Sequence, residues 1–109
     1  NCLMTHLNQK AFEAESDLKA KAKIAAAMLK AIANQSRILI LYNLEGKELS
    51  VTDLNDYLDL SQSALSQHLA VLRKDGLVKT RRESQTIFYS LSDIRASKVI
   101  KTLRELYCS

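Results

Sequence analysis

Leu60 to Val78 reads LSQSALSQHLAVLRKDGLV, and the interpretation of the whole chain depends on this stretch. Three leucines recur at spacings of four and three residues, which places them on one helical face that must be buried: Leu65, Leu69 and Leu72. Ser61 precedes them as a candidate N-cap, and Gly76 follows where a left-handed residue commonly ends a helix. The pattern predicts an amphipathic helix from Ser61 to Asp75.

The opposite face of this predicted helix is polar but almost uncharged. It carries Gln62, Ser63, Ser66 and Gln67, followed by Ala70 and Lys74. A face that is merely solvated usually carries Lys and Glu, whereas short hydroxyls and amides suit close approach to the base edges of DNA. The helix N-terminus also offers backbone N–H groups to a phosphate. Taken alone, the helix fits an incidental solvent face and a DNA-reading face equally well.

The next segment, LVKTRRESQTIFYSL at positions 77–91, predicts a basic β-hairpin. Four residues suit strands, namely Val78, Thr80, Ile87 and Tyr89, and RRESQ would form the connecting tip. Arg81 and Arg82 beside the tip, with Gln85 just beyond, can reach a phosphate or a minor groove. From Ser61 to Ser90 five basic residues stand against two acidic ones. The hairpin favours DNA binding over a plain solvent face.

Helical patterns surround this region. The first runs from Phe12 to Ala33, with an apolar stripe of Leu18, Ala22, Ala25, Leu29 and Ile32. Asn34 can cap a second helix, Gln35 to Glu45, which ends before Gly46 and whose core residues are Ile38, Leu41 and Leu44.

Two more helices complete the pattern. Ser50 and Asp53 resemble a capping box that opens a short helix containing Val51, Leu54 and Leu58. Ser92 can cap the last helix, on which Ile94, Ile100, Leu103 and Tyr107 are expected to share a face. The order of four helices, a β-wing and a fifth helix predicts a mainly α winged helix-turn-helix.

Composition limits the function further. The 109 residues fit one domain over positions 1–109, and a net charge of +4 favours a polyanionic partner. No apolar run approaches the length of a membrane span, so no membrane partner is expected. Two cysteines are too few for a secreted disulfide framework, which favours the cytoplasm. We find no phosphate-binding glycine loop and no nucleophile beside a histidine, so neither an enzyme nor a cofactor is expected.

ELSVTDL (48–54), LSQSALSQHLAVLRKDGLV and IFYSL (87–91) closely resemble the ArsR/SmtB-type winged-helix repressors, and the resemblance extends from about Ala26 to Cys108. Within this family the chain is most similar to the thiol-sensing group that includes HlyU, BigR and SqrR. The resemblance implies a homodimer that binds a palindromic operator and leaves it when an inducer binds. Apolar stripes on the first and last helices can pair across a two-fold axis, or they can simply cover each subunit's own core.

Many relatives sense metals, but this sequence does not favour a metal site. Ser50 stands where the metal sensors carry a cysteine, and serine is a poor ligand for soft metals. The last helix contains Asp93 without a histidine, and neither His6 nor His68 has a ligand at metal-site spacing. His68 is compatible with DNA contact and with a purely structural hydrogen bond.

The remaining candidates for sensing are thiols. Cys108 matches one cysteine of the pair that the resemblance implies, but Tyr42 occupies the position of the other. Cys2 could replace it, giving a Cys2–Cys108 dithiol that responds to reactive sulfur or an oxidant, if their Cα atoms approach within about 7 Å. Alternatively, both cysteines are inert, Cys108 acts alone, or the inducer is unrelated. A winged-helix protein adaptor is the alternative to a DNA-binding regulator, although the Ser/Gln face and the basic wing disfavour it.

Overall fold

The computed structural model describes residues 8–92 and 94–108, with side chains from Ala14 onward. The chain divides into two compact units, residues 1–30 and residues 31–109, and each is described by itself. One domain spanning residues 1–109 stays a prediction. Among the described residues, no single helix is long and apolar enough to cross a membrane, and only α1 and α2 taken together as a bent pair pass that test.

The first unit is formed by helix α1, which runs from Asn8 to Ile32 and continues into the second unit. It begins four residues before the predicted start at Phe12, because the helix-forming sequence extends upstream. Of the predicted stripe, Ile32 is buried, whereas Leu18 and Leu29 are 40% and 58% exposed. Among the described residues, the helix therefore has exposed apolar side chains.

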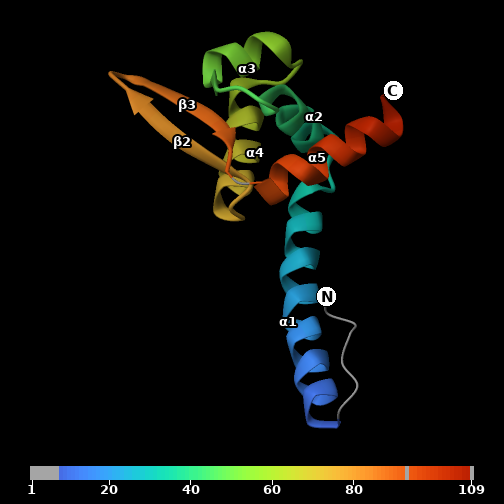
Figure 1. Cartoon of the computed structure of the whole chain (residues 1–109). Coiled ribbons are helices and arrows are strands. Elements are labelled where there is room, and N and C mark those ends of the chain that lie inside the picture. Colours follow the sequence, from blue (N-terminus) through green and yellow to red (C-terminus); the bar gives the residue numbers. More distant parts are fainter. Residues whose placement is uncertain (1–7, 93, 109) are drawn as a thin grey trace. The chain divides into compact units, whose positions relative to one another are not determined.

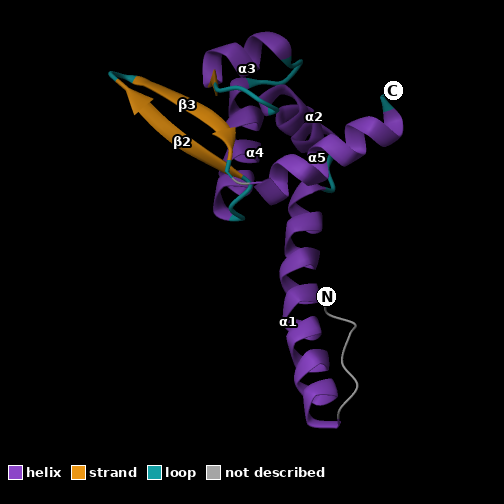
Figure 2. Ribbon diagram, viewed as in Figure 1, coloured by secondary structure: helices purple, strands orange, loops and turns teal. Residues whose placement is uncertain are grey.

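The second unit contains the predicted winged helix-turn-helix (Figures 1 and 2). Its elements are α2 (Gln35–Leu44), β1 (Leu49–Ser50), α3 (Val51–Tyr57), α4 (Gln62–Lys74), β2 (Val78–Glu83), β3 (Thr86–Leu91) and α5 (Ile94–Tyr107). Strands β2 and β3, here called the wing, project away from the helices as a ribbon. The fully buried large side chains come from α2, α3, α4, the residue before β2, and α5: Ile40, Leu41, Leu44, Leu54, Leu65, Leu69, Leu72, Leu77 and Ile100.

The predicted helix caps are confirmed at three positions. The side chains of Asn34 and Ser61 accept hydrogen bonds from the backbone N–H groups three residues later, at 3.1 Å each. Ser50 and Asp53 form the reciprocal capping box at the start of α3. Ser92 donates its hydroxyl to the carbonyl of Gly76, and because residue 93 lies outside the described residues, the predicted cap at Ser92 stays a prediction.

The sheet contains one strand that the sequence did not predict. β1 is only two residues long and pairs antiparallel with β3, which gives the strand order β1-β3-β2. The predicted tip RRESQ was too long, since Arg81, Arg82 and Glu83 belong to β2 and only Ser84 and Gln85 form the turn. Pairing continues to Glu83 and Thr86, which leaves a two-residue connection with Ser84 at a φ of 56°.

The predicted common face of α5 was wrong for Ile94. Ile100 is fully buried and Leu103 is partly covered, but Ile94 and Tyr107 are 68% and 79% exposed. A separation of six residues turns a helix by about 240°, so Ile94 cannot share the face of Ile100. The buried side of α5 is built by Ala96 and Ile100.

Candidate nucleic-acid interface

Helix α4 separates a buried face from an exposed polar face, as predicted. Its three leucines are at most 1% exposed. The side chains predicted to contact DNA at its N-terminal end are all exposed: Ser61, Gln62, Ser63, Ser66 and Gln67. Lys74 in its last turn is exposed as well. The structure thus brings these polar side chains together on one solvent-facing surface, which we call the α4 face.

His68 differs from the other candidates on α4. It is only partly exposed, and its Nδ1 lies 3.4 Å from Nη1 of Arg37 in α2. The Nε of Arg37 donates to the carbonyl oxygen of Ala31 at 2.6 Å. This contact connects α4 to α2, which supports the structural alternative for His68. Arg37 was not recognised from the sequence, because no motif relates positions 37 and 68.

The wing places its two arginines on opposite faces of the ribbon. Side chains alternate along a strand, and Arg81 lies opposite Phe88 whereas Arg82 lies opposite Ile87. Arg82 is exposed and has no ion-pair partner within the part of the chain that the structure describes. Gln85 is exposed in the two-residue turn. From the sequence, the same DNA contact was predicted for both arginines, but their surroundings in the structure differ.

The Arg81 guanidinium contacts the carboxylates of Glu48 and Glu83. Its Nε lies 3.0 Å and its Nη2 2.9 Å from oxygens of Glu48, and its Nη1 lies 2.9 Å from Glu83. Its guanidinium also stacks over the ring of Phe88 at 4.9 Å from the centroid. The hydrogen bond from Arg81 lowers the pKa of the Glu48 carboxyl below its ordinary value, and Glu48 and Glu83 together raise the pKa of Arg81. Glu48 was missed by sequence reasoning, because only the pairing of β1 with β3 brings it to β2.

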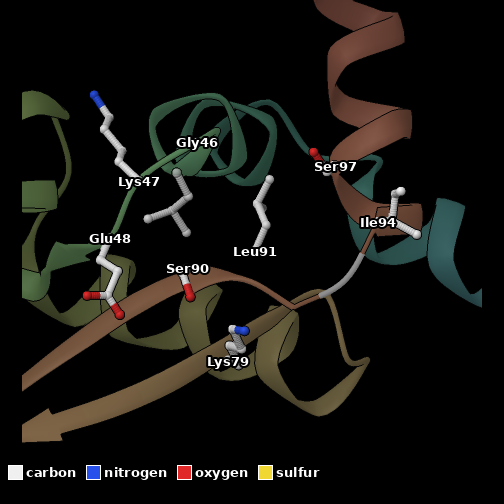
Figure 3. A pocket seen from close by; sticks show the side chains of 9 residues that line it. Gly46, Lys47, Glu48, Lys79, Ser90, Leu91, Ile94 and Ser97 are labelled. Carbon is white, nitrogen blue, oxygen red and sulfur yellow. The ribbon is translucent and has the colours of Figure 1, made fainter.

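An open pocket of about 450 Å³ lies at the base of the wing (Figure 3). It is lined by residues of the wing, of α5 and of the turn between α2 and β1, including Lys79, Ser90, Ile94 and Glu48. Among the described residues, no group of three or more His, Cys, Asp or Glu side chains could hold a metal ion. His6 and Asp93 lie outside these residues.

The end of α5 is fastened to the end of α2 by Arg104. Its Nε donates to Glu45 at 2.7 Å, its Nη2 donates to the carbonyl of Tyr42 at 3.0 Å, and its guanidinium stacks over the Tyr42 ring at 4.7 Å. Cys108 follows one turn later and carries a free, exposed thiol. Cys2, the other cysteine of the predicted thiol pair, lies outside the described residues.

Comparisons with known proteins agree with this arrangement. Residues 34–80 match the model of the family described as bacterial regulatory protein, arsR family. The transcriptional activator HlyU of Vibrio cholerae serotype O1 is 56% identical over 77% of this chain and 78% of its own length. The biofilm growth-associated repressor of Agrobacterium fabrum is 38% identical over 84% of this chain and 79% of its own length.

A solved structure leads to the same conclusion. Reduced HlyU from Vibrio cholerae N16961 matches with a TM-score of 0.81 at 50% identity, covering 85% of this chain and 98% of that one. These relatives are transcriptional regulators rather than enzymes. The chain belongs to the ArsR family of bacterial regulatory proteins.

Proposed function

We propose that the protein is a homodimeric, sequence-specific DNA-binding transcriptional repressor, in which the α4 face reads base edges of a palindromic operator. The observation that carries this proposal is the exposed, nearly uncharged Ser/Gln surface of α4 beside the basic wing. Gln67 and Gln62 offer paired donors and acceptors to adenine, and Ser63 and Ser66 can donate or accept. Arg82 and Lys74 supply positive charge for the phosphate backbone.

The homodimer is supported by apolar side chains on the first and last helices. Leu18, Ile24 and Leu29 of α1 and Ile94, Leu106 and Tyr107 of α5 are each at least 40% exposed in the single chain. A second copy of the chain can cover both helices in an isologous interface, and the resulting two-fold axis matches a palindromic operator. Analytical ultracentrifugation tests this assembly, and a monomer at micromolar concentration would contradict it.

DNA binding is tested by fluorescence anisotropy with a duplex that the wild-type protein selects from a random pool. The logarithm of the affinity is expected to fall linearly with the logarithm of salt concentration, by about 0.9 per neutralised phosphate. An apolar adaptor surface would respond little to salt. Alanine at both Gln67 and Arg82 is expected to weaken binding. Unchanged affinity in that double variant would show the interface assignment to be wrong.

We also propose thiol control of DNA binding, because Cys108 is free and exposed at the end of α5. Tyr42, at the position where a second cysteine is expected, lies close to this end of α5 through its contact with Arg104. Tyrosine cannot form the usual bridge, so Cys2 is the candidate partner. An organic polysulfide would supply the bridging sulfur and accept the two electrons that the two thiols release.

This control is tested by measuring anisotropy and intact mass on reduced and polysulfide-treated protein. Release of DNA together with the mass of a sulfur-bridged Cys2–Cys108 supports the dithiol switch. Cys108→Ser is expected to abolish both changes, and Cys2→Ser distinguishes the dithiol from Cys108 acting alone. A mass change without release of DNA would mean that the cysteines do not control binding.

A further inference from the structure

The Arg81 guanidinium is already occupied in the free protein. Two of its nitrogens contact Glu48 and the third contacts Glu83, while its plane lies against the ring of Phe88. A guanidinium donates five N–H groups within its own plane, and these carboxylates take three of them, including the Nε and Nη2 pair that could bind a phosphate through two hydrogen bonds. A phosphate that approached Arg81 would therefore have to share the guanidinium with two carboxylates, whose charges offset its own.

Glu48 connects this arginine to the rest of the winged helix-turn-helix. It immediately precedes β1, and β1 leads directly into the capping box that starts α3. β1 pairs with the wing through only two positions, Leu49 with Tyr89 and Ser50 with Phe88. The contact between Glu48 and Arg81 therefore reaches across β3 and connects the segment before β1 directly to β2, beside a very short strand pairing.

We propose that Arg81 is a positioning residue, which holds the wing in place through Glu48, and that Arg82 on the opposite face is the wing arginine that contacts the phosphate backbone. This inference rests on the proposed DNA-binding function. We assign the phosphate contact to Arg82 because its side chain is exposed and has no ion-pair partner among the described residues. Arg81 and Arg82 are adjacent in sequence, and only the alternation along β2 gives them different roles.

The variant Glu48→Gln is expected to change DNA affinity in opposite directions, depending on whether Arg81 contacts phosphate or positions the wing. If Arg81 contacts phosphate, neutralising Glu48 frees the arginine and removes a negative charge, so affinity for the selected duplex rises. If Arg81 positions the wing, affinity falls, by up to about fivefold on the scale of an exposed ion pair. A rise in affinity would overturn the proposal.

Salt dependence separates the two arginines. Arg82→Gln is expected to reduce the slope of log affinity against log salt by about 0.9 per subunit, the value for one phosphate contact, or about 1.8 for the dimer. Arg81→Gln and Arg81→Lys are both expected to lower affinity with little change in slope, because lysine cannot bind two carboxylates in one plane. Lys79→Gln removes a charge from the same face of β2 and measures the general charge effect. Full affinity in Arg81→Lys, or a slope reduced by Arg81→Gln alone, would overturn the proposal.

A measurement without DNA keeps this inference separate from the proposed function. The heteronuclear ¹H–¹⁵N NOE of Ser84 and Gln85 reports the rigidity of the wing turn in the protein without DNA. Arg81→Gln is expected to lower it, and Arg82→Gln is expected to leave it unchanged. If the wild-type protein binds no duplex, the DNA-binding function fails while this test still stands. An unchanged NOE in Arg81→Gln would show that Arg81 does not hold the wing.

Discussion

Helix α4 and the wing both expose polar side chains, but they do so under different constraints. The core covers one side of α4 through its three leucines, so everything on the opposite side is free. The outer part of the wing extends beyond the core, where the side chains of residues 81–86 are exposed on both faces, and one of these faces carries an ion-pair cluster. Exposure thus identifies the candidate contacts on α4, whereas on the wing the side-chain partners must also be known.

The largest effect is expected from breaking the buried side of α4. Leu69→Ala should lower the free energy of unfolding by about 2–5 kcal/mol, since it leaves a cavity at a fully packed position. Ser66→Ala on the exposed side should change it by less than about 0.5 kcal/mol. Urea denaturation followed by circular dichroism at one protein concentration measures both. Equal losses would contradict the division of α4 into two faces.

A smaller effect is expected from removing one base contact on the α4 face. Gln67→Ala should weaken binding to the selected duplex by about 1–3 kcal/mol for each half-site and leave binding to a scrambled duplex nearly unchanged. Arg82→Gln should weaken both duplexes alike, because phosphate contacts carry no sequence information. Gln35→Ala, an exposed glutamine at the start of α2, is the matched control. Equal weakening of both duplexes by Gln67→Ala would remove its assignment to a base.

The junction between α4 and the wing is expected to be sensitive to backbone strain. Gly76 has a φ of +75° with open space around the position of a Cβ atom, so alanine there would be strained without a steric clash. Gly76→Ala should therefore destabilise the protein by about 1–2 kcal/mol, and Gly76→Asn by less, because asparagine visits the left-handed region more readily. Thermal denaturation tests this order. Equal melting temperatures of the glycine and alanine proteins would contradict it.

The smallest effect concerns pH. Arg81 lowers the pKa of Glu48 from its ordinary value of 4.5, so their ion pair is complete above that value and is lost only as pH falls through the lowered one. Between pH 8 and pH 5.5 the signals of the wing are expected to stay unchanged. A carboxyl ¹³C titration of Glu48 should have its midpoint below 4.5. In Arg81→Gln the midpoint should return toward the ordinary value, and a midpoint at or above 4.5 in the wild type would exclude the ion pair.

The sequence was sufficient for features that depend on neighbouring positions. The leucine spacing of α4, the caps at Asn34, Ser50 and Ser61 and the turn at Gly76 all involve residues within one or two helical turns. Contacts between distant segments were not predictable. Glu48 and Arg81 are 33 positions apart, and Arg37 and His68 are 31 apart. Such pairs depend on strand register and helix packing, which no local pattern contains.

The alternation of side chains along β2 also makes the wing sensitive to whether an insertion is odd or even. One extra residue between Lys79 and Arg81 would exchange the faces of the two arginines, moving the second to the place that Glu83 holds now, on the face of Glu48, and the first to the opposite face. Two extra residues in each strand would keep the original faces and lengthen the ribbon by about 7 Å. Evolution or protein engineering can therefore vary the length of each strand of this wing in steps of two residues. A single insertion in β2 would instead make Arg81, rather than Arg82, the arginine on the face opposite Glu48.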